Sequence, residues 1–265
     1  MIELPNKEKG VVFTIKGAFA HFRKTYTQTS MLTYPFPPRT ALSGIVGAVL
    51  GVPRDEVYEL MQPPNAYFVL EILTPIRKLT VTTNFISTKE DFRKPILKAG
   101  KNMISCFEST KNRTQIPMEI LMPCPPYNML SFRVAFWHKD LLLLKKFTEM
   151  LSNKQSFFPV YLGISEFLAS IEMEGITSEI LEINNYEGEI NSVVVNEAIL
   201  NVNGEFIKTG NKFNIEYVLL YANKDFSDKY YSNIVYSDES KPLSLRVVNA
   251  LKYQQSVWVL YEAFK

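Results

Sequence analysis

Apolar and polar positions along the first half of the chain predict one strand followed by one helix. The segment Val11–Lys16 has the β-branched and aromatic content of a strand, and Gly17 follows it. Residues 38–51 predict a helix, because a proline opens the segment, a glycine closes it and apolar residues recur at helical spacing. These apolar residues are Leu42, Ile45, Val46 and Val49.

The elements after this helix follow in an order typical of a mixed α+β domain. A short second helix is expected at Arg54–Met61, a long strand at Asn65–Leu79, two strands at Met118–Met122 and Tyr127–Trp137, and a helix at Lys139–Leu151. This order predicts a ferredoxin-like (RRM-like) α+β domain over residues 1–160. The segment of about residues 80–117 interrupts it, and we expect this insertion to form a long β-hairpin arm.

The chain after the glycine at position 163 is rich in strand patterns separated by turn residues. We expect residues 161–265 to form a smaller antiparallel, β-rich region packed on the first domain. The predicted strands are Phe167–Met173, Glu179–Ile183, Ser192–Leu200, Phe213–Tyr221 and Val257–Phe264.

Composition indicates a folded protein outside the membrane. Hydrophobic residues make up 46% of the chain and aromatic residues 13%, enough for a sizeable core. The first ten residues are polar and charged, unlike a signal peptide. The longest apolar stretch, Ala41–Val52, is shorter than the roughly 17–25 residues that a membrane helix needs. Cys106 and Cys124 match no zinc or redox spacing, so we expect a cytoplasmic protein with no metal and no cofactor.

Charge is distributed unevenly, although the formal net charge is only +2. Residues 1–115 carry 16 Lys and Arg against 9 Asp and Glu, whereas residues 116–265 carry 13 against 18. The arm is the most basic part, since Arg77–Arg113 holds 9 basic and 3 acidic residues. A basic half of this kind favours contact with a polyanion, although such asymmetry also occurs by chance.

The loop Ala18–Pro37 combines the side chains that single-stranded RNA recognition uses. Arginine and lysine neutralise phosphates, flat rings stack on unpaired bases, and hydroxyl groups bond to base edges and to the 2′-hydroxyl. The start of the helix at residue 38 adds free N–H groups that suit a phosphate. The candidate RNA-binding residues are His21, Phe22, Arg23, Lys24, Tyr26, Arg39, Thr40 and Ser43 in and after the loop, and Arg93, Lys94, Lys98, Lys101, Arg113 and Gln115 in the arm.

Simpler interpretations stay open for the same residues. Phe22, Tyr34 and Phe36 are also expected as core or interface aromatics, and the arm could be a solvated loop with no ligand. The sequence contains no phosphate-binding loop, dinucleotide fingerprint, nucleophile elbow or zinc-protease motif.

Several motifs in a fixed order resemble a known family. The most specific is Phe13–Gly51, FTIKGAFAHFRKTYTQTSMLTYPFPPRTALSGIVGAVLG, in which Pro-Phe-Pro-Pro precedes a small-residue helix. Shorter matching pieces follow at Thr83–Ile86, Arg113–Pro117, Pro159–Gly163 and Ser165–Ala169. Over roughly residues 10–170 the chain resembles the CRISPR-associated Cas-five family, and most closely its type I-B members.

This resemblance implies a ferredoxin-like fold with a β-hairpin thumb and a smaller C-terminal region. It also implies a place at the foot of the Cascade complex, where the family holds the repeat-derived 5′ handle of the CRISPR RNA. The implied partners are the Cas-seven backbone subunit and the Cas-eight large subunit, with target DNA reached indirectly through the complex. In most subtypes a separate Cas-six ribonuclease cuts the precursor RNA, whereas in subtype I-C the family member does so.

The residues favour a binding subunit over a nuclease. Metal-free RNA cleavage needs a base for the 2′-hydroxyl and a cation for the phosphorane, and the chain has only two histidines, His21 and His138. No histidine lies in the arm, where a cutting member of the family would need one. We therefore predict no catalytic residues. The alternatives are a metal-independent endoribonuclease that processes precursor CRISPR RNA and a structural bridge with few RNA contacts.

Overall fold

The computed structural model describes residues 4–27, 30–86, 113–200, 212–225 and 227–262, and within these ranges the protein is a mixed α+β fold of mostly antiparallel sheets. Its largest sheet has the strand order β4-β7-β1-β8, and every neighbouring pair in it is antiparallel. These strands are β1 (Val11–Gly17), β4 (Ala66–Ile72), β7 (Leu130–His138) and β8 (Ser170–Ile176).

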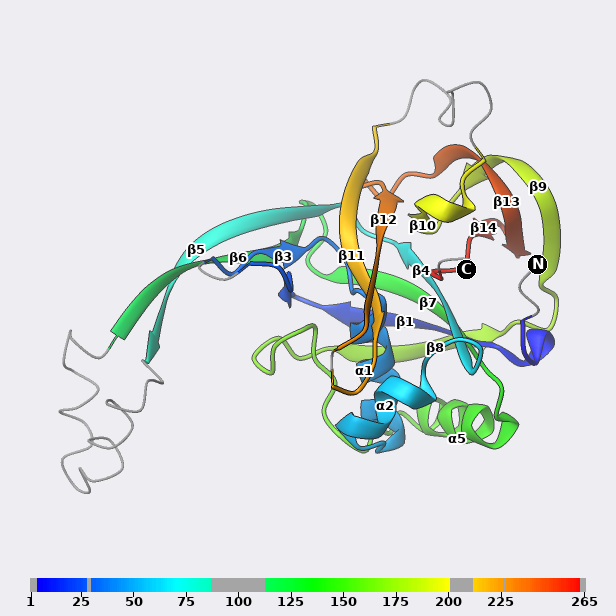
Figure 1. Cartoon of the computed structure of the whole chain (residues 1–265), viewed down its shortest axis with the longest axis horizontal. Coiled ribbons are helices and arrows are strands. Elements are labelled where there is room, and N and C mark those ends of the chain that lie inside the picture. Colours follow the sequence, from blue (N-terminus) through cyan, green and yellow to red (C-terminus); the bar gives the residue numbers. More distant parts are fainter. Residues whose placement is uncertain (1–3, 28–29, 87–112, 201–211, 226, 263–265) are drawn as a thin grey trace.

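Both faces of this sheet are covered, which explains why β4 is buried along its whole length. Alternate side chains of β1 point to opposite faces because a strand has a period of two. Phe13 packs on one face against Phe147 of helix α5 (Leu141–Ser152), with ring centroids 5.4 Å apart. Val12 on the other face belongs to a separate apolar cluster with Trp258 from the C-terminal part of the chain. Helices α1 (Arg39–Leu50) and α5 lie on the first face (Figure 1).

The helix boundaries confirm the sequence prediction. Helix α1 begins after Pro38 and ends at Gly51, whose φ of 75° lies in the left-handed region that glycine adopts at little cost. Helix α2 covers Arg54–Leu60. Helix α5 is capped by Asp140, whose carboxylate accepts hydrogen bonds from the N–H groups of Leu142 and Leu143. No helix within the described ranges is long and apolar enough to cross a membrane.

The C-terminal half forms two further three-stranded sheets, with the orders β14-β13-β9 and β10-β12-β11. Their elements are β9 (Leu181–Ile190), β10 (Val194–Val195), the 3-10 helix η4 (Asn196–Ala198), β11 (Asn214–Ala222), β12 (Lys229–Tyr236), β13 (Leu243–Tyr253) and β14 (Ser256–Trp258). Strands β12 and β13 were not predicted from the sequence, and the predicted strand at 192–200 consists of β10 and η4.

The two halves are joined closely along the β4 edge of the first sheet. The N–H groups of Val193 and Tyr261 donate to the carbonyls of Leu70 and Phe68, each at 2.8 Å. Strand β8, which the expected boundary at residue 160 assigns to the second region, pairs with β1 instead. The first sheet therefore includes residues from beyond that boundary.

Two strands, β5 (Ile76–Ile86) and β6 (Arg113–Pro123), form an antiparallel ladder that extends away from the first sheet (Figure 1). The sequence predicted one strand over Asn65–Leu79, but the chain breaks there into β4 and β5. Pro75 lies in this break, where its missing N–H disturbs no ladder. The predicted arm of about residues 80–117 thus begins and ends in paired strands, and its middle lies outside the described residues.

Candidate nucleic-acid interface

The loop after β1 is bonded at two places to the free edge of β6. The N–H of Ala20 donates to the carbonyl of Leu121 at 3.0 Å, and Leu121 donates back to Ala20 at 2.8 Å. Further along, Met31 donates to Pro117 at 3.1 Å and accepts from Glu119 at 2.9 Å. These bonds place the loop and the β5–β6 ladder side by side as one surface.

The loop folds on itself as a small antiparallel pair, β2 (Phe22–Arg23) and β3 (Thr33–Tyr34). Phe22, Tyr34 and Phe36 are buried in the main core, so these three rings are not available to stack on RNA bases. Phe36 packs edge-on against Tyr236, with centroids 5.1 Å apart. The interpretation of these aromatics as core residues is therefore confirmed, and Phe22 is not a surface contact.

Charged residues gather where this loop meets β5, β6 and β11. Lys24 Nζ is 2.5 Å from Glu216 Oε1, and Tyr26 donates its hydroxyl to the same oxygen at 3.1 Å. Although burial opposes it, the bond to Glu216 raises the pKa of Lys24. Lys78 lies 3.7 Å from Glu119, and burial lowers its pKa. Both lysines therefore have carboxylate partners within the protein, which reduces their free positive charge.

An arginine and two aromatic side chains of the loop are nevertheless exposed at its surface. Arg23 is exposed and makes no ion pair within the described ranges. Tyr26 is 51% exposed, and Phe19 is 40% exposed. On β5, Arg77 is exposed and likewise has no ion-pair partner in the part of the chain described. We call Arg23 and Tyr26, both in the loop, the loop strip.

Arg39 was predicted to bind phosphate, but the structure places it in the interior at 1% exposure. Its Nε donates to Glu262 Oε2 at 2.6 Å, and its Nη2 donates to the carbonyls of Met61 and Ala66 at 2.7 and 3.1 Å. The other oxygen of Glu262 accepts the N–H of Phe68 at 3.1 Å. Arg39 therefore holds the C-terminal segment against β4, and that prediction was wrong.

The start of helix α1 also differs from the predicted phosphate seat. The N–H groups of Ala41 and Leu42 already donate to the carbonyl of Pro38. Ser43 is buried, and its hydroxyl donates to the carbonyl of Arg39 at 3.1 Å. Thr40 is half-buried and lies in the wall of a pocket.

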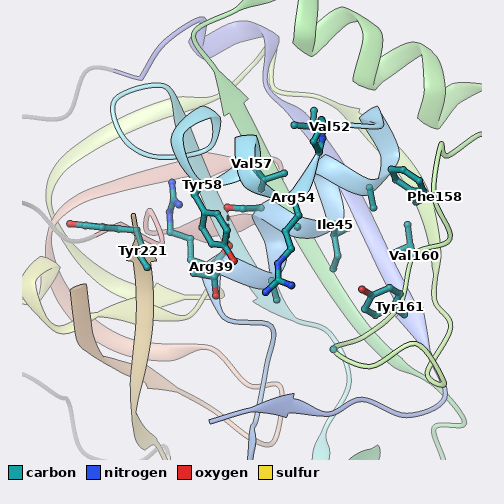
Figure 2. A pocket seen from close by; sticks show the side chains of 18 of the residues that line it. Arg39, Ile45, Val52, Arg54, Val57, Tyr58, Phe158, Val160, Tyr161 and Tyr221 are labelled. Atoms are coloured by element: carbon teal, nitrogen blue, oxygen red, sulfur yellow. Dashed lines mark hydrogen bonds between the residues drawn. The ribbon is translucent and has the colours of Figure 1, made fainter. Parts of the chain in front are cut away.

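This pocket, of about 690 Å³, is formed by α1, α2, the segment 158–163 and the end of β11 (Figure 2). Ile45, Val57 and Val160 form much of its apolar lining. The N–H groups of Phe157 and Phe158 donate to the carbonyls of Val49 and Ala48 at the end of α1, which fixes segment 158–163 at the pocket rim. In the view of Figure 2 the side chain of Arg54 extends across the pocket between Tyr58 and Tyr161.

The predicted arm residues cannot all be placed. Arg93, Lys94, Lys98 and Lys101 lie outside the described residues, and Arg113 is described only as a backbone position at the start of β6. Gln115 is exposed on β6 and pairs with Asn84 of β5.

Both histidines are buried. His21 is 1% exposed, its Nδ1 is 2.7 Å from the carbonyl of Glu119, and burial lowers its pKa. The Nδ1 of His138 accepts the N–H of Asp140 at 2.9 Å, so its Nε2 carries the proton toward the carbonyl of Leu60 at 3.1 Å. Within the described residues no group of three or more His, Cys, Asp or Glu side chains is placed to hold a metal ion.

Sequence reasoning missed Arg54 and Tyr161 as candidates. Tyr161 lies in the motif Pro159–Gly163, so that motif was a signal for it. Arg54 begins a short helix after Pro53, where an arginine usually faces solvent, and only the packing of α2 against α1 brings it to the pocket.

These features define a mixed α+β protein with a surface of exposed basic and aromatic side chains beside a projecting ladder. Residues 10–195 match the model of the family described as CRISPR-associated protein (Cas_Cas5). Because this match covers more than half of the chain, the protein belongs to that Cas-five family. No curated protein matches the sequence.

Solved structures of CRISPR proteins are similar only at low identity. A chain of a structure described as a CRISPR RNA-guided surveillance complex is 12% identical, with a TM-score of 0.48, over 89% of this chain and 91% of that one. A structure described as a Cas protein is 13% identical, with a TM-score of 0.45, over 89% and 98%. A chain of a type III-B Cmr-beta complex bound to cognate target RNA and AMPPnP is 13% identical, with a TM-score of 0.44, over 88% and 86%.

Proposed function

We propose that this chain is a non-catalytic subunit of a type I CRISPR effector complex that holds the 5′ handle of the guide RNA. One observation carries the proposal: backbone hydrogen bonds tie the loop after β1 to the edge of β6, so that the loop and the ladder form one surface. A single strand of RNA could contact both elements at once.

The chemistry of the loop strip and of Arg77 on β5 supports a single-stranded ligand. Arg23 and Arg77 offer guanidinium groups that are not engaged by carboxylates within the described ranges. Tyr26 offers a half-exposed ring, and stacking of a base on such a ring contributes roughly 1–3 kcal/mol. Backbone-directed cations position RNA without reading its sequence.

We also infer a ferredoxin-like domain with a thumb. Strand and helix order β1-α1-β4-β7-α5-β8, with sheet order β4-β7-β1-β8, supports this assignment. The ladder β5–β6 enters between β4 and β7, where the sequence places the basic insertion, and we assign it as the base of the thumb.

The environment of the histidines supports a binding role rather than cleavage. A general base must reach the 2′-hydroxyl, but His21 and His138 are 1% and 2% exposed, and both bond to backbone groups. Incubating the purified protein with labelled repeat RNA in the absence of divalent metal should therefore leave the RNA intact. Specific cleavage would establish the endoribonuclease alternative instead.

Exposed apolar side chains support contacts with other subunits. Leu79 on the ladder, Phe157 beside α1 and Ile215 on β11 are 48%, 67% and 54% exposed. We propose that such surfaces meet the Cas-seven backbone and Cas-eight large subunits, and that target DNA is reached only through the assembled complex in the cytoplasm.

The RNA-binding proposal is tested by removing the loop strip. The variant Arg23→Ala/Tyr26→Ala should bind handle RNA at least about tenfold more weakly in a fluorescence anisotropy titration, because a phosphate contact and a stacking surface are lost. The matched control is Lys145→Ala, which removes an exposed charge on α5. Equal affinities of the two variants would refute the proposal.

Salt dependence separates phosphate contacts from other effects. Each phosphate contact to a single strand contributes about 0.7 to the slope of log affinity against log salt, so Arg23→Ala should flatten the slope by about that amount. Replacing Arg93, Lys94, Lys98 and Lys101 by Ala should flatten it further, and an unchanged slope would exclude the arm as an RNA contact.

A further inference from the structure

The pocket between α1, α2 and segment 158–163 has the size of a ligand site. Its volume of about 690 Å³ falls within the range of about 300–1,000 Å³ that is common for small-molecule and cofactor sites. The pocket is open beside Gly44 of α1, because a Cβ added to this residue meets no atom within 4 Å. By contrast, a Cβ on Gly47 would lie 2.6 Å from Val57, so α1 and α2 pack tightly one turn further on.

The pocket lining combines aromatic rings with two arginines, of which Arg39 is buried and paired with Glu262. Phe158 and Tyr161 lie at its rim and are 48% and 44% exposed. Arg54 extends across the opening and has no ion-pair partner within the described ranges (Figure 2). A flat ring beside an unengaged guanidinium suits an unstacked base together with its phosphate, since bases stack on aromatic faces and guanidinium groups pair with phosphate.

The pocket lies next to the loop that carries the loop strip. Gly163 lines the pocket, and a Cβ at this position would lie 1.9 Å from the carbonyl oxygen of His21. The N–H of His21 donates to the carbonyl of Leu162 at 3.0 Å, so the pocket wall and the loop are bonded together. A strand bound along Arg23 is therefore close to the pocket, which favours RNA over a protein side chain as its occupant.

We propose that one nucleotide of the bound single-stranded RNA leaves the stack and inserts its base into this pocket, with the adjoining phosphate on Arg54. The base packs against Tyr161 or Phe158, and the surface of α1 at Gly44 forms the floor. This inference rests on the proposed function, because it requires that the chain binds the guide-RNA handle.

An abasic scan tests the insertion independently of RNA sequence. Handle RNAs that lack one base at each position in turn are titrated against the wild-type chain and against Gly44→Trp, whose indole fills the pocket. For the wild type, one abasic position should lower the affinity about tenfold, the loss expected for one stacked base. For Gly44→Trp, intact RNA should bind about tenfold more weakly, and the same abasic position should have no further effect.

A second variant tests the pocket independently, in case Gly44→Trp does not fold. Arg54→Ala should reduce the affinity for intact RNA and flatten the salt slope, whereas Arg54→Lys should restore the slope because it keeps the charge. Lys145→Ala is again the control for loss of an exposed charge. Thermal unfolding of each variant reports whether its fold is kept.

The results distinguish failure of this inference from failure of the proposed function. If the wild type binds handle RNA but base removal has the same effect in wild type and Gly44→Trp, the pocket inference is overturned and the proposed function stands. If the wild type does not bind handle RNA, both are overturned. If Gly44→Trp binds RNA normally but no longer co-purifies with the other subunits, the pocket holds a protein side chain, which also overturns the inference.

A free nucleotide offers the pocket the same base and phosphate as a nucleotide within RNA. Titration with AMP, CMP, GMP and UMP, each alone, should give much weaker binding than the RNA, because a single nucleotide lacks the contacts along the loop strip. Tight binding of a free nucleotide together with RNA binding that is insensitive to base removal would overturn the assignment to RNA.

Discussion

Replacing Arg39 by Met separates the role that the structure gives this residue from the role that its sequence position suggests. The guanidinium is buried, bonds Glu262 and donates to the carbonyls of Met61 and Ala66. Methionine fills a similar volume but leaves the carboxyl group and both carbonyls without this donor. We therefore expect Arg39→Met to lower the free energy of unfolding.

The expected loss is about 3–5 kcal/mol at pH 8, the range measured when one partner of a buried ion pair is removed. It should be smaller at pH 5, because the carboxyl group of Glu262 then takes up a proton and no charge is left unpaired. Domains of this size commonly have only about 5–15 kcal/mol of stability, so the variant should remain folded but be visibly weakened.

Urea unfolding followed by tryptophan fluorescence measures this loss for Arg39→Met, Glu262→Met and the double variant. The double variant should lose less than the sum of the single losses, because removing both partners leaves no unpaired charge. Handle-RNA affinity per folded molecule should stay within about threefold of the wild type, since the buried guanidinium contacts no ligand. Unchanged stability with a large loss of RNA affinity would refute this reasoning and return Arg39 to the RNA-binding residues.

Three further variants test local features of the fold. Burial raises the pKa of Glu262 to about 7, against the pull of Arg39, from an ordinary value of 4.5. The folded carboxyl group thus holds a proton more tightly than the unfolded one. The free energy of unfolding should therefore fall by about 3 kcal/mol as pH rises from about 4.5 to about 7. Urea titrations across this pH range should show the fall in the wild type and not in Glu262→Gln. Gly163→Ala should lose at least about 3 kcal/mol in the same titration, because its φ is 94° and its Cβ would clash with the carbonyl of His21. Asp140→Ala should lose about 1 kcal/mol by removing the cap of α5, and Asp140→Ser should recover most of it; equal losses for both would contradict the capping role.

Local signals in the sequence were sufficient for the helices. Pro38 and Gly51 bound α1 in the structure as they did in the sequence, because a proline at the start and a glycine at the end act through their own backbone conformations. The strand Val11–Lys16 is likewise confirmed as β1. The residues that specify these elements lie within them or directly beside them.

Long-range contacts explain what the sequence could not indicate. Arg39 and Glu262 are 223 positions apart, and nothing near either residue marks them as partners. The loop after β1 meets β6 at two isolated bridges, at Ala20 and Met31, and not along a regular ladder, so no strand pattern marks the contact in the sequence. Strand β13 alternates buried and half-buried positions and contains polar residues, so its pattern is weak by itself and is completed only by pairing with β9 and β14.

The path of the chain after β14 has a consequence for biosynthesis. Val259 donates to Ser192 at 2.8 Å, Tyr261 donates to Phe68, and Glu262 bonds the first residue of α1. The N-terminal elements leave the ribosome long before residue 262 has been made. Until then, the edge of β4 and the side chain of Arg39 on α1 lack the partners that cover them in the finished fold. We expect this part of the fold to close only once residues 259–262 have left the ribosome, with chaperones shielding the exposed edge until then.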